Sequence, residues 1–279
     1  MAKKTCYELL KDTRKAKIAV PAFNIDNLES ALAVISAVKE TNCPVIIQTI
    51  PRTLSYGGIA TYPAMVDALM KDVSCDYAIH LDHGSSLDLV KKCISSGFSS
   101  VMYDGSSLPF EENVIKTSLI AEYSRQFSIS VEGELGTIGG KEESDVDSVA
   151  NCTSPIEARL FVEKTNVNML AIGVGTCHGI YKGTPKINVD RIYEIASEVD
   201  IPLVLHGATG LDNKIVTDCI DAGISKINFA TELRLAFTSG LKSGLARNNL
   251  EFDPKNYLTD AIEAVKSAVI KKIALCYRL

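Results

Sequence analysis

The stretch YAIHLDHGSSLDLVKKCISSGFSSVMY, residues 77–103, contains the pattern on which our assignment of the fold depends. It opens with an apolar run at residues 77–81, continues with a 3.6-residue apolar period over residues 87–96, and closes with a second apolar run at residues 99–103. Short continuous apolar runs are typical of strands that are covered on both faces, as in a parallel sheet. We therefore interpret this stretch as one strand–helix–strand unit.

The same alternation recurs along the whole chain. Residues 28–40 and 189–199 show the same helical period between apolar runs. We expect eight strands, at residues 18–23, 44–49, 77–81, 99–103, 128–135, 169–174, 202–206 and 225–230. Alternation sustained eight times favours an α/β fold of the closed (β/α)8 or TIM-barrel type over an open doubly wound sheet.

Length and segmentation agree with a single barrel. The 279 residues suit one (β/α)8 barrel, and no linker marks a boundary, so we expect residues 1–279 to form one domain. From residue 256 onward an extra C-terminal helix is expected, which caps the barrel or serves an oligomer interface. Residues 136–148, GTIGGKEESDVDS, are too long for an ordinary connection and form either a surface excursion or an active-site lid.

Composition narrows the class of protein. A net charge of −5 and a pI near 5.5 argue against nucleic acid as a main partner, because no basic surplus is available to neutralise phosphates. The eight cysteines include no Cys-x-x-Cys pair, which favours reduced thiols and a cytoplasmic location. Residues 1–12 look like a polar helix rather than a signal peptide, and no apolar run reaches the roughly 20 residues that span a bilayer. We expect a soluble protein without a membrane partner.

Three of the four histidines lie where strands are expected to end. His83 follows the third strand, His178 follows the sixth and His206 ends the seventh. All strand ends of a parallel barrel open onto one face, where barrel enzymes work, so these imidazoles can converge on one metal. Three neutral imidazoles with an open coordination position suit a catalytic Zn²⁺. His80 is interpreted as structural or as a support for a ligand, since alternate strand residues point opposite ways.

The alternative for each histidine is a structural or surface role, which is commoner for a lone histidine. The metal interpretation therefore depends on the three coming together. Asp82, Asp104, Glu132 and Glu134 also lie at the ends of apolar strands, where a charged side chain is not expected without a task.

The later strands are followed by glycines and hydroxyls, in HGIYKG (178–183), HGATG (206–210) and NFAT (228–231). Backbone amides next to glycine, at the start of a helix, bind anions, and barrel enzymes often hold a phosphate after strands seven and eight. Each glycine alone is equally compatible with an ordinary turn. Beside a metal, the set points to a phosphorylated substrate.

With these motifs the sequence resembles the class II ketose-bisphosphate aldolases. The similarity follows the family's order over nearly the whole chain. The matching segments are VPAFN (20–24), HLDHG (80–84), VMYDGS (101–106), VEGELG (131–136), GGKE (139–142), TCHGIY (176–181), LHGATG (205–210) and KINFATE (226–232).

The resemblance implies roles for particular residues. His83, His178 and His206 would hold the catalytic zinc, which replaces the Schiff-base lysine of the other aldolase class. Asp82 would exchange the proton of the substrate's C4 hydroxyl, and Glu142 would move the proton at C3 of dihydroxyacetone phosphate. Asp104 and Glu134 match residues near an alternative metal position.

The resemblance also implies a set of substrate contacts around the phosphate and a monovalent cation, Na⁺ or K⁺, beside it. These residues are Asn24, Gly179, Lys182, Gly207, Ala208, Thr209, Asn228, Phe229, Ala230 and Thr231. It further implies a homodimer or homotetramer that acts in carbohydrate metabolism, of which glycolysis is an example.

Three positions depart from the family pattern and bear on the substrate. Ile50 stands where many members carry a hydroxyl, Thr209 replaces a common serine, and Lys255 replaces an arginine that often reaches a neighbouring subunit's phosphate. We expect fructose 1,6-bisphosphate or tagatose 1,6-bisphosphate as substrate, and the string at residues 228–233 leans toward tagatose.

Other activities stay open at this stage. The close alternative is an aldolase for a phosphorylated deoxy-keto sugar acid of the 5-dehydro-2-deoxyphosphogluconate type, for which Arg52 or Lys255 would anchor the distal anion. A barrel metallohydrolase and a partner subunit without activity are more distant alternatives.

Overall fold

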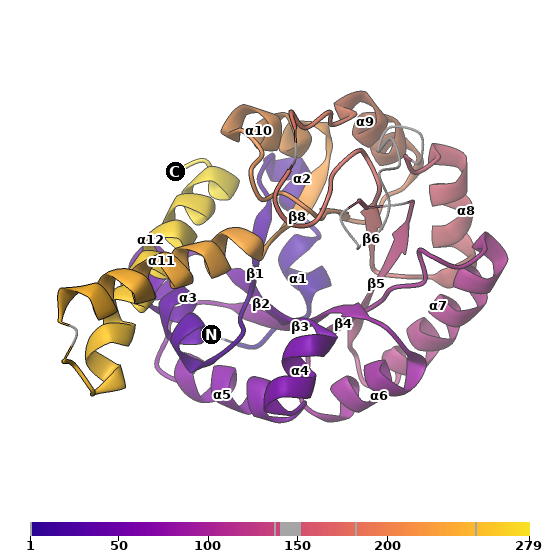
Figure 1. Cartoon of the computed structure of the whole chain (residues 1–279). Coiled ribbons are helices and arrows are strands. Elements are labelled where there is room, and N and C mark those ends of the chain that lie inside the picture. The colour runs from indigo at the N-terminus through magenta and orange to yellow at the C-terminus, as the bar shows by residue number, and fades with distance from the viewer. Residues whose placement is uncertain (1, 137, 140–151, 182, 249) are drawn as a thin grey trace.

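Eight parallel strands form a closed barrel in the computed structural model, which describes residues 2–136, 138–139, 152–181, 183–248 and 250–279 (Figure 1). Each strand pairs with the next along the chain, and β8 closes the barrel against β1. The strands are β1 (Val20–Asn24), β2 (Val45–Thr49), β3 (Tyr77–Gly84), β4 (Ser100–Tyr103), β5 (Ser130–Leu135), β6 (Met169–Ile172), β7 (Leu203–Leu205) and β8 (Ile224–Phe229). Each overlaps its expected range, so the predicted TIM barrel is confirmed.

Helices surround the barrel, and the extra C-terminal helix is present as α12. The helices are α1 (Cys6–Leu10), α2 (Thr13–Ala16), α3 (Leu28–Thr41), α4 (Pro51–Gly57), α5 (Thr61–Met70), α6 (Leu87–Ser95), α7 (Phe110–Arg125), α8 (Pro155–Thr165), α9 (Val189–Glu198), α10 (Asn213–Ala222), α11 (Thr231–Arg247) and α12 (Pro254–Tyr277). Asp253 caps α12 by accepting a hydrogen bond from the backbone N–H of Lys255. α12 packs on α11 and α3, and the α11–α12 pair projects from one side of the barrel (Figure 1). None of the helices in the described ranges is long and apolar enough to span a bilayer.

The N-terminal helix α1 packs two apolar side chains into the protein interior, although the sequence predicted a polar helix there. Within the region expected to be a polar helix, Cys6 and Leu10 on α1 are fully buried. They belong to an apolar cluster with inward-facing strand residues such as Ala22 and Ile46. We infer that α1 closes the end of the barrel at which the strands begin.

The interior of the barrel changes from apolar to polar along the strands. Residues two apart share a face, so Ala22 on β1 is followed on the same face by Asn24. Ile46 on β2 is likewise followed by Gln48, and Ala78 on β3 by His80. The apolar members lie in the cluster at α1, and the polar members follow toward the carboxyl ends of the strands. Polar chemistry is therefore concentrated at one end of the barrel.

Candidate active site

Three histidines meet at the carboxyl end of the barrel. His83 lies near the end of β3, His178 lies in the loop after β6, and His206 follows β7 directly. One ring nitrogen from each lies within 4.8 Å of the other two. Nε2 of His83 and Nδ1 of His206 are 3.1 Å apart, and the ring of His178 is 4.9 Å from that of His83. The structure thus brings together the three side chains that the sequence singled out.

An irregularity in β3 places both Asp82 and His83 in the site. Neighbouring residues of a regular strand point to opposite faces, but His83 has φ of 51° and the register with β4 shifts between Leu81 and Gly84. A positive φ is strained for a residue with a Cβ and recurs at functional positions. Gly84 completes the bend, since a Cβ there would meet the backbone carbonyl of Met102. Two adjacent side chains therefore reach one cavity.

The donor set fits a Zn²⁺ ion. Imidazole nitrogens are preferred zinc ligands, and a three-histidine set leaves a coordination position for substrate. Nδ1 of His83 lies 2.9 Å from Oδ2 of Asp104, which leaves Nε2 of that ring facing His206. Burial lowers the pKa of His206 well below its usual range, so this imidazole is neutral, as a ligand must be. His83, Asp104 and Glu134 form a second possible donor group next to the first.

Asp82 is buried next to the histidines and held by side-chain amides. Its Oδ2 accepts hydrogen bonds from Nδ2 of Asn24 at 3.0 Å and Nε2 of Gln48 at 3.2 Å. Its Oδ1 accepts from Nδ2 of Asn228 at 3.2 Å and lies 3.7 Å from Nε2 of His83. Burial alone would raise the pKa of Asp82, but the positive charges nearby, that of His83 foremost, and the hydrogen bond from Asn24 together outweigh it, and the pKa falls to about 2. Asp82 is therefore a carboxylate at neutral pH.

A cavity of about 450 Å³ opens above these residues. Of the expected substrate contacts, seven line it: Asn24, Gly179, Gly207, Thr209, Asn228, Ala230 and Thr231. Gly207 has φ of 67°, and a Cβ there would meet the backbone of Cys177, so only glycine fits the position. Gly207 therefore lines the cavity with backbone atoms alone.

Two expected substrate contacts do not face this cavity, and a third lies outside the described residues, as does the expected catalytic residue Glu142. Ala208 is buried and does not line the cavity. Phe229 is fully buried and stacks on Phe23 at a centroid distance of 5.8 Å, so its side chain belongs to the core around the barrel. Glu142 and Lys182 lie outside the described residues.

The described start of the expected lid lies beside the histidine loop. The backbone N–H of His178 donates to the carbonyl of Gly139 at 2.7 Å, and that of Gly139 donates to the carbonyl of Thr176 at 3.1 Å. Tyr181 then ties this loop to the next one by donating from its hydroxyl to the carbonyl of Gly207 at 2.8 Å. Gly139 therefore lies directly beside the loop that carries His178.

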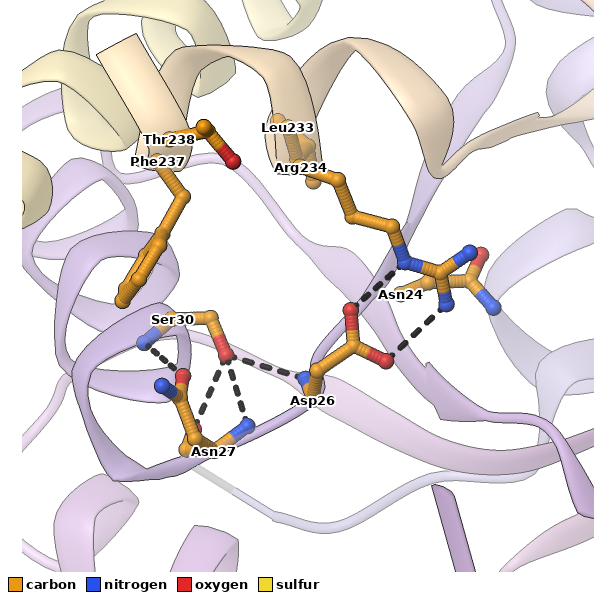
Figure 2. Close-up of a pocket in the computed structure, with 8 residues that line it drawn as sticks. All are labelled: Asn24, Asp26, Asn27, Ser30, Leu233, Arg234, Phe237 and Thr238. Atoms are coloured by element: carbon orange, nitrogen blue, oxygen red, sulfur yellow. Dashed lines mark hydrogen bonds and ion pairs between the residues drawn. The ribbon is translucent and has the colours of Figure 1, made fainter. Parts of the chain in front are cut away.

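Two arginines also line this cavity. Arg52 on α4 is exposed, and its neighbours Ile50 and Pro51 line the same wall. Arg234 on α11 is held by Asp26, with Nε 2.7 Å from Oδ2 and Nη2 2.9 Å from Oδ1 (Figure 2). A smaller cavity of about 170 Å³ between α3 and α11 shares Arg234 and Asn24 with the main one.

Sequence reasoning did not assign Gln48 or Arg234 to the site. Gln48 carries a signal, because it is the polar residue of the otherwise apolar run VIIQ at the carboxyl end of a strand. Arg234 carries none, because a charged residue on a helix is usually solvated. Lys255, one of two expected distal anchors, is 84% exposed in its side chain, pairs with Asp253 and does not line this cavity.

Comparison with known families gives a match over almost the entire chain. A family model described as "Fructose-bisphosphate aldolase class-II" matches residues 4–278. The match includes the strand ends that carry the histidines.

Solved structures give the same result. The chain is similar to the YdjI aldolase from Escherichia coli K12, with 28% identity, a TM-score of 0.88, and coverage of 99% of this chain and 97% of that one. It is also similar to a putative fructose-1,6-biphosphate aldolase from Coccidioides immitis, with 27% identity, a TM-score of 0.86, and coverage of 98% and 96%. Fructose-bisphosphate aldolase from Campylobacter jejuni, at 21% identity, a TM-score of 0.85 and coverage of 96% and 93%, shares the fold.

Proposed function

The chain belongs to the class II fructose-bisphosphate aldolase family, whose members are aldehyde-lyases, and we propose that it is a zinc-dependent ketose-phosphate aldolase. It would split fructose 1,6-bisphosphate or tagatose 1,6-bisphosphate reversibly into dihydroxyacetone phosphate and glyceraldehyde 3-phosphate. The observation that carries this proposal is the convergence of His83, His178 and His206 beside the Asp82 carboxylate.

His83, His178 and His206 would hold the zinc, with Asp104 and Glu134 able to provide an alternative position. When bound, the ion supplies Lewis acidity that stabilises the negative charge left when the C3–C4 bond breaks. No lysine is needed to form a Schiff base in this chemistry.

Asp82 would accept the C4 hydroxyl proton during cleavage and return it during condensation. Its depressed pKa keeps it unprotonated at neutral pH, and the amides of Asn24, Gln48 and Asn228 fix its orientation. Glu142, which follows Gly139 closely in the sequence, would move the proton at C3. A lid formed by residues 136–148 would exclude water from this step.

The phosphate of the dihydroxyacetone half would bind over the loops after β6, β7 and β8. Gly179, Gly207, Thr209 and the segment at residues 228–231 offer amides and hydroxyls there, and Lys182 lies in the same loop by sequence. Na⁺ or K⁺ would accompany the phosphate.

The two arginines support an anionic group at the other end of the substrate. With the dihydroxyacetone half over the loops after β6, β7 and β8, the aldehyde half would extend past Asp82 toward Arg52 and Arg234, which line the same cavity. The planar guanidinium group can form two parallel hydrogen bonds with either a phosphate or a carboxylate. This fits a bisphosphate, and it equally supports the second candidate, an aldolase for a phosphorylated deoxy-keto sugar acid.

We further propose that residues 1–279 act as one cytoplasmic domain that assembles as a homodimer or homotetramer. Leu250 and Phe252, at the outer end of the α11–α12 pair, are 82% and 90% exposed, which is typical of a surface covered by another subunit.

A coupled assay tests the proposed activity. Zinc-loaded protein should release dihydroxyacetone phosphate from fructose 1,6-bisphosphate, tagatose 1,6-bisphosphate or the phosphorylated deoxy-keto sugar acid. The value of kcat/KM for each of the three compounds identifies the substrate. Removal of zinc with a chelator should abolish turnover, and Zn²⁺ or Co²⁺ should restore it. Release of inorganic phosphate alone would favour a metallohydrolase, and no turnover of any candidate would favour a subunit without activity.

A further inference from the structure

Beneath the three histidines, the barrel contains a buried ion pair that the proposed reaction does not use. Lys226 on β8 and Glu132 on β5 are both fully buried, and Lys226 Nζ lies 2.7 Å from Glu132 Oε2. Burying two charges costs so much desolvation that apolar residues of similar size often stabilise a fold equally well. Fold stability alone therefore does not explain this pair.

The second oxygen of Glu132 contacts one of the histidines. Oε1 lies 2.9 Å from Nε2 of His206. A carboxylate only accepts hydrogen bonds, so Nε2 must donate, and the lone pair of a neutral ring then lies on Nδ1. Nδ1 of His206 is the atom that faces the other possible ligands, 3.1 Å from Nε2 of His83 and 3.6 Å from Oε2 of Glu134.

We propose that Glu132, anchored by Lys226, is a positioning residue that orients His206 to bind the metal through Nδ1. Engagement of one oxygen by Lys226 limits rotation of the carboxylate, so the other oxygen stays directed at the imidazole. Carboxylates that hold the second nitrogen of a metal-bound histidine are a recurring support in metal sites. The inference rests on the proposed metal site but not on the identity of the substrate.

His80 completes the surroundings of the carboxylate. Its Nε2 lies 3.4 Å from Oε2 of Glu132, and its Nδ1 lies 2.9 Å from Oγ of Ser100, which contacts Ser130 in turn. His80 faces the interior from the same strand as His83 but lies deeper in it. The sequence left His80 with either a structural role or a role in supporting a ligand. The structure places it against Glu132, the residue that we propose to orient His206.

Zinc affinity, measured by competition with a chromophoric chelator, tests the proposal without any substrate. Glu132→Leu combined with Lys226→Met replaces the pair by apolar side chains and leaves no unpaired buried charge. We expect this double variant to unfold cooperatively near the wild-type temperature but to bind zinc about 10–100-fold more weakly. Glu132→Gln keeps an acceptor for His206, so its zinc affinity should lie between those of the wild type and the double variant.

A matched control separates positioning from general disturbance of the interior. Ser130→Ala removes a buried polar group from the same network without touching His206, and it should bind zinc within about threefold of wild type. If the double variant folds and also binds within threefold, the positioning role is wrong. If the double variant does not fold, the protonated nitrogen of His206 in the zinc-loaded wild-type protein decides.

The protonated nitrogen of His206 gives a second readout. Only four histidines are present, so long-range ¹H–¹⁵N correlation spectra of zinc-loaded protein can be assigned by single replacements. We expect His206 to carry its proton on Nε2. A proton on Nδ1, with zinc bound through Nε2, would contradict the arrangement.

Discussion

Asp82 has both carboxylate oxygens occupied by amide donors, and it lies next to His83 rather than among the three histidine nitrogens. Removing it should therefore leave the metal in place and remove only the proton acceptor. We expect Asp82→Ala to lower kcat by about 10²–10⁴-fold, the usual range for loss of a general base. Turnover and bound zinc should be measured on the same preparation.

Asp82→Asn is the matched control for this replacement, because it keeps the volume and loses only the basic oxygen. It should be as inactive as the alanine variant while retaining one zinc per chain. Loss of zinc from either variant would mean that Asp82 supports the metal site instead.

His83 predicts how zinc binding depends on pH. Burial alone would lower its pKa, but the charges of Asp82 and the hydrogen bond to Asp104 raise the pKa to about 9. Below pH 9, His83 in the metal-free site therefore carries a proton that zinc must displace. Loss of this proton should make the zinc affinity rise by about tenfold per pH unit up to pH 9 and stay constant above it. Chelator competition between pH 6 and 10 measures this slope, and a flat profile across that range would contradict it.

The same residue shows where sequence reasoning stops. The position of His83 after an apolar run predicted that it would reach the catalytic face, and it does. Period-two alternation, however, predicts opposite directions for His83 and Asp82, and only the positive φ of His83 resolves this. That conformation coincides with the register shift against β4 and does not follow from the residue type, so it could not be read from a single sequence.

At the scale of elements, α3 connects local sequence to the wall of the site. Asn27 caps α3 by accepting from the backbone N–H of Ser30 at 3.0 Å, and the Ser30 hydroxyl accepts from the backbone N–H of Asp26 at 3.0 Å (Figure 2). The cap thus fixes the residue that holds Arg234. We expect Asn27→Ala to lower the free energy of unfolding by about 1 kcal/mol, measured by denaturant titration.

Lys39→Ala, an exposed replacement near the other end of α3, should change this free energy by less than about 0.5 kcal/mol. Equal effects of the two variants would show that the cap contributes nothing.

The elements differ in how readily the sequence predicts them. Strands were predictable because apolar runs of five or six residues are buried on both faces, and α12 because its period continues past the eighth strand. The role of α1 was not predictable, since a helix of five residues is too short for its apolar period to single out Cys6 and Leu10 as the buried positions. Their burial depends on the open end of a barrel assembled from distant strands.

At the scale of the whole molecule, the α11–α12 pair is the feature that a solitary barrel does not need. It projects from the barrel (Figure 1). The connection between the two helices contains Leu250 and Phe252, whose side chains are almost completely exposed. Exposed apolar groups of this size are costly in water unless another surface covers them. We therefore expect the wild-type protein to sediment as a dimer or tetramer at micromolar concentration.

Leu250→Asp combined with Phe252→Asp should convert this oligomer to monomers, because two carboxylates cannot be buried unpaired at an interface. Ile115→Asp, on α7 at a distance from the pair, is the matched control, since it exposes 59% of its surface and should leave the mass unchanged. Each barrel keeps its own three histidines, so the monomers should bind zinc as tightly as wild type. An unchanged sedimentation coefficient in the double variant would place the interface elsewhere, and a monomeric wild type would remove the need for one.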